Sequence, residues 1–255
     1  DAGTGRAAGG RRAPAGPTGG WGCSRAPRGG AGRSPRAGEA ARRVTAPALA
    51  ELALAAEPAA WAAAGFRVEV GAVTVGGVTL RLLGTGAGRR IVDCSLRGVG
   101  DAPALDRLPV SAAMAAGPPP EPAGPHPNGV RAIDHLVAFT PDLDRTVAAG
   151  VALGLDLRRI RDEAAPAGSP RQAFFRLGEL MLEVAQAPEG SPVSGDDPAR
   201  FYGLAFVVDD LEAAAASAPG LLGEPRDAVQ PGRRIATYRR EAGLGLPVAL
   251  MTPRR

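Results

Sequence analysis

The sequence has 255 residues, of which 45% are hydrophobic, and a formal net charge of +4. A chain of this length and composition can bury a sizeable core, so we expect a globular protein. The two cysteines, Cys23 and Cys94, form neither a disulfide framework nor a CxxC zinc motif, which favours a cytoplasmic location.

The basic charge is concentrated at the start of the chain. Residues 1–43 hold nine arginines against two acidic residues, whereas the remainder holds 21 arginines against 24 acidic residues. We predict that the arginine- and glycine-rich residues 1–44 are a disordered tail. This tail lacks the interleaved phenylalanine or tyrosine that stacks on bases, so nucleic acid is not an expected partner. The most apolar window, residues 46–66, is broken by two glutamates and two prolines, so no membrane span is expected either.

Residues 48–112 carry a faint version of a strand and helix pattern that returns twice further along the chain. The proline-dense residues 113–129 follow as a linker, expected to be extended and semi-rigid. His126 stands between two prolines of this linker, and we interpret it as a solvent-exposed loop residue.

Residues 130–190 show the pattern clearly, in the order β-α-β-β-β. The first strand contains "IDHLVAF", and Thr140 is the expected cap of a helix with Pro141 at its first position. The last two strands form a hairpin that turns at Gly178. Residues 200–254 repeat the arrangement, with Asp209 or Asp210 as the helix cap.

Four stretches carry a family resemblance: "IDHLVAFTPDLDRTV", "QAFFRLGELMLEV", "FYGLAFVVDDLEAA" and "GLPVALMTP". With them, residues 130–255 resemble the vicinal oxygen chelate superfamily, which includes glyoxalases, dihydroxybiphenyl dioxygenases and bleomycin-resistance proteins. The resemblance implies an α+β fold in which two βαβββ modules form an open eight-stranded, barrel-like cleft. Residues 48–112 would precede it as a degenerate third module.

The resemblance also implies a metal site. In metal-dependent members, one ligand lies on the first strand of each module and one on the last. His135 and Glu183 occupy these places in the first module, and such a pair suits a divalent ion such as zinc, nickel, iron or manganese. In the second module the corresponding places hold Gly203 and the region from Ala249 to Met251. An alternative ligand set would add Glu51 and either Asp93 or Cys94 from the faint module.

Candidate substrate-binding residues lie on strands and turns beside this pair. Gln172 and Phe174 begin a strand, with Ala173 and Phe175 as the alternative inward-facing phase, and Gln230 precedes a Pro-Gly turn. Strand alternation puts Arg234 and Arg240 on one face and Arg233 and Arg239 on the other. One pair would face the cleft and bind a carboxylate or phosphate, and we select Arg234 as the candidate. The competing interpretation is a solvated face paired with Glu241 or Asp227.

Two functional hypotheses follow. The first is a glyoxalase-like, metal-dependent lyase, isomerase or dioxygenase that acts on a small oxygenated substrate, with Glu183 moving a proton. The second is a non-catalytic protein of the bleomycin-resistance type that binds or sequesters a small molecule, which the missing second-module ligands favour. A homodimer stays open, because barrels of this kind are in some cases completed by strands of another chain.

Overall fold

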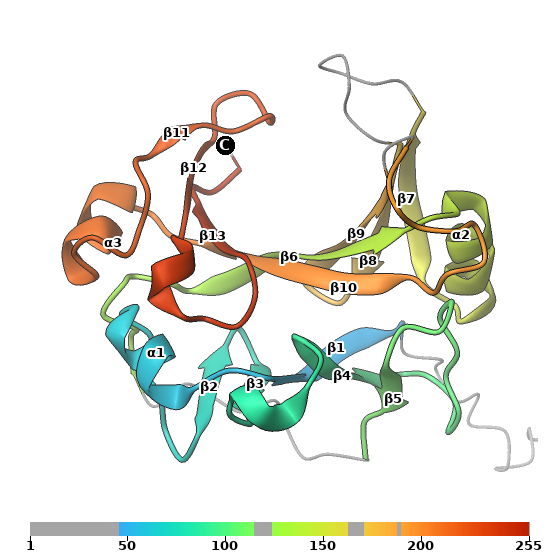
Figure 1. Cartoon of the computed structure of the whole chain (residues 1–255), viewed down its shortest axis with the longest axis horizontal. Helices are drawn as coiled ribbons and strands as arrows, with labels where there is room; N and C mark the ends of the chain where they lie inside the picture. The colour runs from blue at the N-terminus through green and yellow to red at the C-terminus, as the bar shows by residue number, and fades with distance from the viewer. Residues whose placement is uncertain (1–45, 115–123, 163–170, 188–189, 255) are drawn as a thin grey trace, which may run out of the picture. The chain divides into compact units, whose positions relative to one another are not determined.

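The computed structural model describes residues 46–114, 124–162, 171–187 and 190–254, which form an eight-stranded and a five-stranded sheet (Figure 1). These described residues belong to one compact unit. The predicted tail and the middle of the predicted linker lie outside the described residues. Within the described part of the chain, no helix is long and apolar enough to cross a membrane.

The first module of the eight-stranded sheet has the predicted βαβββ order. Its helix begins at Leu143 and not at Pro141, because the Asp142 carboxylate accepts a hydrogen bond from the Arg145 backbone N–H at 2.9 Å and so caps the helix. Thr140 is instead the last residue of the preceding strand. The elements are β6 (Ala132–Thr140), α2 (Leu143–Ala152), β7 (Asp156–Arg161), β8 (Gln172–Leu177) and β9 (Leu180–Gln186).

The second module repeats this order and shares the sheet, whose strands run β11-β12-β13-β10-β6-β9-β8-β7. Asp210 caps its helix by accepting from the Ala213 N–H at 2.9 Å, which confirms one of the two predicted caps. The paired βαβββ fold predicted for this half of the chain is therefore confirmed. The elements are β10 (Arg200–Val207), α3 (Leu211–Ser217), β11 (Arg226–Asp227), β12 (Arg234–Thr237), η2 (Arg240–Ala242) and β13 (Val248–Met251).

The strand register relates the two modules by a local two-fold axis. Strands β6 and β10 are antiparallel, and Leu136 faces Leu204 at the centre of their ladder. On either side of this pair, Ala205 faces His135 and Val137 faces Gly203. A two-fold axis through the central pair therefore makes Gly203 the equivalent of His135. By the same symmetry Glu183, which pairs with Val137, corresponds to Ala249, which pairs with Ala205.

Each of the two central strands carries a β-bulge at a symmetry-equivalent position. In β6 the register steps over Asp134, because Ala205 pairs with His135 and Phe206 pairs with Ile133. In β10 the register steps over Tyr202 in the same way. A bulge leaves its extra residue unpaired and redirects the neighbouring side chains, and bulges of this kind recur next to active sites.

The five-stranded sheet is a reduced copy of the eight-stranded one. Strand β1 pairs parallel with β3, as β6 pairs with β9. It pairs antiparallel with β4, as β6 pairs with β10. Strand β4 pairs parallel with β5, as β10 pairs with β13. Residues 48–112, predicted to be one degenerate module, hold a βαββ unit, β1 to β3 with α1, followed by two further strands, β4 and β5. The elements are β1 (Ala48–Leu54), α1 (Pro58–Ala63), β2 (Ala72–Val75), β3 (Val78–Leu82), η1 (Thr85–Ala87), β4 (Ile91–Arg97) and β5 (Val110–Ala112).

Aromatic residues that follow β1 pack the reduced sheet against the second module. Phe66 packs against Phe206 with ring centroids 5.3 Å apart, and the buried Trp61 indole N–H donates to the Leu244 carbonyl at 3.3 Å. Burying a large side chain of this kind contributes about 1.5–3 kcal/mol. Residues of both sheets form one hydrophobic core.

His126 belongs to this packed junction, so our interpretation of it as an exposed loop residue is wrong. Its side chain is 7% exposed. Its Nδ1 accepts from the Arg67 backbone N–H at 2.9 Å, and its Nε2 lies 3.0 Å from the Thr74 carbonyl oxygen. Because Nδ1 must be the acceptor, Nε2 carries the proton and donates to Thr74. Burial lowers the pKa of the His126 imidazole, which favours the same neutral form.

Candidate functional site

His135 and Glu183, the two candidate ligands, meet in one cleft of the eight-stranded sheet. His135 Nε2 lies 3.8 Å from Glu183 Oε2, and the side chains are 16% and 19% exposed. Two adjoining cavities of about 400 and 230 Å³ share both residues. We call their combined space the His135 cleft, whose shared lining residues are His135, Arg161, Phe174, Glu183 and Gln230.

The bulge at Asp134 builds a buried hydrogen-bonded chain behind His135. His135 Nδ1 lies 2.7 Å from Asp134 Oδ2, and Asp134 Oδ1 accepts from Arg233 Nη2 at 2.7 Å. The Asp134 and Arg233 side chains are 7% and 3% exposed. Since an ionised carboxylate accepts only, His135 Nδ1 donates the proton in this contact. In its neutral form, the His135 ring held by this contact has its lone pair on Nε2, facing Glu183.

The two carboxyl groups of the cleft have pKa values that move in opposite directions. Burial opposes ionisation of Asp134, but hydrogen bonds from His135 and Arg233, with their charges, outweigh it and lower the pKa of this carboxyl. Burial raises the pKa of the Glu183 carboxyl, and the nearby His135 and Arg161 only partly offset this effect. Two carboxyl groups driven apart in this way are suited to different roles, one as a permanent anion and one as a proton carrier.

Gln172, Phe174 and Gln230, three of the candidate substrate-binding residues, lie in the cleft. Gln172 Nε2 donates to Glu183 Oε1 at 2.6 Å, and its Oε1 accepts from Arg161 Nη1 at 3.2 Å. The Arg161 guanidinium lies 5.8 Å from the centre of the Phe174 ring. The Gln230 side-chain oxygen accepts from Arg233 Nη1. These contacts hold the Glu183 carboxyl group, Arg161 and Arg233 in place.

Arg234, the fourth candidate, points elsewhere, and its neighbour Arg233 takes its place. Arg234 Nη1 pairs with Glu212 Oε1 of α3 at 2.7 Å, whereas Arg233 lines the cleft. Our sequence reasoning also missed Asp134. The signal for it is "IDHL", in which two adjacent polar residues interrupt the alternation of a strand, as a β-bulge does.

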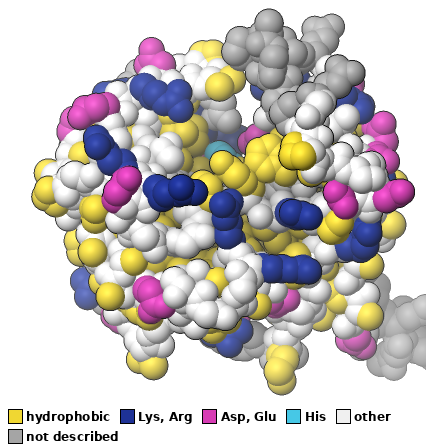
Figure 2. All heavy atoms as spheres, in the orientation of Figure 1, with side chains coloured by type: hydrophobic (Ala, Val, Ile, Leu, Met, Phe, Trp, Pro, Cys, Tyr) yellow, Lys and Arg dark blue, Asp and Glu magenta, His cyan; other side chains and the backbone are white. Residues whose placement is uncertain are grey.

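Arginines make the lining of the cleft positive. Arg158, Arg159, Arg161, Arg233 and Arg254 line the larger cavity, where Glu183 is the one acidic residue of the lining. Arg233 is paired with Asp134 and Arg158 with Asp156, so Arg159, Arg161 and Arg254 are the arginines that this lining offers to a ligand. Figure 2 shows basic side chains in a band across the middle of one face, with acidic side chains nearer its edges. The chemistry of the lining favours an anionic ligand, because guanidinium groups bind carboxylate and phosphate in bidentate geometry.

The donors present do not fit a resident divalent metal held by the protein. Catalytic zinc sites use three protein ligands, and here the first module offers His135 and Glu183. In the second module the equivalent of Glu183 is Ala249 and the equivalent of His135 is Gly203. A Cβ added at Gly203 would lie 2.5 Å from the Pro247 carbonyl oxygen. Among the residues that the structure describes, no three His, Cys, Asp or Glu side chains are grouped to hold a metal.

The alternative ligand set that draws on the faint module is not assembled either. Glu51 forms an ion pair with Arg81 Nε at 2.8 Å on the reduced sheet. Asp93 accepts a hydrogen bond from Ser111 at 2.6 Å. The lining of the His135 cleft contains neither residue, nor Cys94.

The described strands and helices between residues 130 and 254 have the paired βαβββ topology that the resemblance to the vicinal oxygen chelate superfamily implies. No protein-family model matches the sequence, and no curated protein is detectably similar.

Solved structures similar to about half of the chain include methylmalonyl-CoA epimerases. The Mycobacterium tuberculosis enzyme is 19% identical, with 50% of this chain and 91% of that chain covered and a TM-score of 0.40. A Streptomyces coelicolor variant in complex with 2-nitronate-propionyl-CoA is 23% identical, with 49% and 99% covered and a TM-score of 0.40. A further epimerase, in complex with methylmalonyl-CoA and NH4+, is 24% identical, with 47% and 92% covered and a TM-score of 0.38.

Proposed function

We propose that residues 130–254 catalyse proton transfer on a small organic anion bound in the His135 cleft, with His135 as the base and Glu183 as the acid. The observation that carries the proposal is the facing pair itself: His135 Nε2 and Glu183 Oε2 are 3.8 Å apart inside an arginine-lined cleft. The reaction belongs to the isomerase branch of the functions expected from the sequence.

The contacts of His135 and Glu183 suit them to the roles of base and acid. Asp134 accepts the Nδ1 proton of His135 and so leaves the Nε2 lone pair free to remove a proton from carbon. The electron pair of the broken C–H bond moves into the adjacent carbonyl group, and the resulting oxyanion lies among the arginines of the cleft. Glu183, whose raised pKa favours its protonated form, delivers a proton to the carbanionic carbon. After product release, His135 loses the proton it has taken to solvent and Glu183 regains one from solvent, so the net change is an isomerisation without an oxidant or reductant.

Hydrogen exchange into candidate substrates tests this function. Protein prepared with and without a chelator is incubated in D2O with 2-oxo acids, 2-hydroxy acids, substituted malonates, phosphorylated carbonyl compounds and acyl-CoA thioesters. We expect deuterium to replace the hydrogen next to the carbonyl group of at least one compound, with or without the chelator, as measured by proton NMR.

Two variants separate the roles. His135→Gln and Glu183→Gln should each slow the exchange by about 10²–10⁴-fold, the usual contribution of a positioned acid or base. Glu179→Gln is the matched control, because this exposed carboxylate lies in the turn before β9 and should leave the rate unchanged. Exchange that persists in both cleft variants would overturn the proposal. Tight binding of a compound without any exchange would instead support the sequestering protein.

A further inference from the structure

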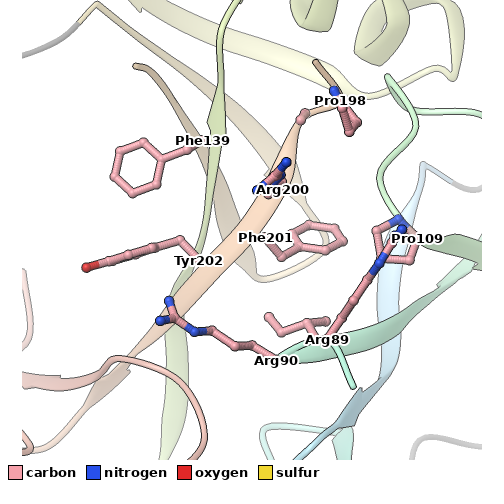
Figure 3. A pocket seen from close by; sticks show the side chains of 10 residues that line it. Arg89, Arg90, Pro109, Phe139, Pro198, Arg200, Phe201 and Tyr202 are labelled. Carbon is pink, nitrogen blue, oxygen red and sulfur yellow. The ribbon is translucent and has the colours of Figure 1, made fainter. Parts of the chain in front are cut away.

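A second cavity lies where the reduced sheet meets the start of β10, apart from the His135 cleft. It has a volume of about 560 Å³, within the range of small-molecule sites. Figure 3 shows that it draws side chains from the segment before β4 and from β6 and β10. We call it the junction cavity; its functional groups are Arg89, Arg90, Phe139, Arg200, Phe201 and Tyr202.

The charge of the junction cavity is uniformly positive. Arg89, Arg90 and Arg200 line it, and its lining contains no acidic residue. All three arginines are exposed, and none forms an ion pair with another described residue. Three guanidinium groups around one cavity provide the charge and the fork geometry that bind phosphate groups.

Two aromatic side chains, Phe139 and Tyr202, line the junction cavity beside these arginines. The bulge in β10 turns Tyr202 toward Phe139, and the two rings meet edge to face at 4.7 Å. The Arg90 guanidinium lies 5.9 Å from the centre of the Tyr202 ring, and Figure 3 shows it on the side of that ring opposite Phe139. Arg90 and Phe139 thus cover the two sides of the Tyr202 ring, and a flat ligand ring would stack on Tyr202 by taking the place of the exposed Arg90 guanidinium.

A further cavity lies between the junction cavity and the His135 cleft along β6. It shares Tyr202 with the lining of the junction cavity and His135 with the lining of the His135 cleft, so the three spaces are neighbours. Phe139, Val137 and His135 alternate on one face of β6. With a rise of about 3.3 Å per residue, Phe139 lies about 13 Å from His135 along the strand.

We propose that the junction cavity binds the phosphate-bearing, ring-containing end of an elongated substrate whose reacting end lies at His135. This inference rests on the proposed function for the position of the reacting end. It gives the reduced sheet a role, because Arg89 and Arg90 select substrates by their distal group. The chemical class is a nucleotide-like anion: a phosphate or diphosphate for the arginines and a flat ring for Phe139 and Tyr202.

Calorimetric titration of the full chain with ADP and with inorganic pyrophosphate tests the subsite directly. We expect the double variant Arg89→Gln/Arg90→Gln to weaken ADP binding by about tenfold or more. Arg239→Gln/Arg240→Gln is the matched control, since these adjacent arginines are exposed and line none of the four cavities described above. Tyr202→Ala should weaken ADP by about fivefold or more and leave pyrophosphate unchanged.

The outcomes separate this inference from the proposed function. His135→Gln should bind ADP as the wild type does, so the subsite can be established even if no exchange is found. Once a substrate is known, Arg89→Gln/Arg90→Gln should raise its KM and leave kcat unchanged. Equal ADP binding by this double variant and its control, or loss of ADP binding in His135→Gln, would overturn the inference.

Discussion

The two modules of the eight-stranded sheet share one backbone plan and differ in chemistry. Both have the βαβββ order, both caps are aspartates, and both central strands carry a bulge at equivalent positions. The first module places Asp134, His135 and Glu183 at the bulge and on the last strand. The second module places Tyr202, Gly203 and Ala249 at the same positions.

This difference teaches that symmetry of the fold does not impose symmetry of the site. The bulge of the first module directs polar groups into the His135 cleft, whereas the bulge of the second module turns Tyr202 toward the junction cavity. The second module still contributes Arg233, which directly precedes β12 and donates a hydrogen bond to the Asp134 carboxylate. The result is one acid–base site per pair of modules, supported from both.

The largest expected effect on stability comes from breaking that support. Asp134→Asn leaves the Arg233 guanidinium buried without its anion, and removal of one partner of a buried ion pair costs about 3–5 kcal/mol. Denaturant unfolding measures the change. Asp209→Asn is the control, because its ion pair with Arg131 is exposed and should contribute under about 1 kcal/mol. Equal losses in the two variants would show that Asp134 does not hold Arg233.

A smaller effect is expected where the second module departs from the first. Gly203→Ala would place a Cβ 2.5 Å from the Pro247 carbonyl oxygen, so the backbone must shift. We expect a loss of about 1–3 kcal/mol, as for other overpacked positions. Gly86→Ala, which has open space around the added carbon, should change stability little. An unchanged melting temperature in Gly203→Ala would mean that this position could accept the side chain that the first module carries.

The smallest expected effect is a change in the pH dependence of stability. The raised pKa of Glu183 means that the folded state disfavours its charged form. The wild type should therefore lose stability as pH rises from the unfolded pKa of about 4.3 through the folded value, and Glu183→Gln should not. Unfolding at pH 4.5–8 measures the difference, with Glu179→Gln as the exposed control. A wild type that gains stability relative to Glu183→Gln as pH rises would contradict a raised pKa for this carboxyl.

Strand and helix periodicity predicted the repeated modules, whereas the family resemblance, and not periodicity, implied that His135 and Glu183 lie together. It did not predict Asp134 in the site, because a bulge shifts the alternation by one residue. Arg233 was the alternative to the selected Arg234, and alternation could not decide between them because Arg233 lies one residue before β12, in a turn. His126 was misread because its partners, Arg67 and Thr74, are more than 50 residues away in the sequence.

The protonation of the two histidines tests the central claim most directly. The chain has only His126 and His135, and the structure gives their neutral rings opposite tautomers, with the proton on Nε2 of His126 and on Nδ1 of His135. Long-range proton–nitrogen NMR of chelator-treated protein at pH 8 distinguishes them, and His135→Gln assigns the signals. We predict an Nδ1–H form for His135 whose Nε2 shift moves in Glu183→Gln. An Nε2–H form for His135 would contradict its role as the base.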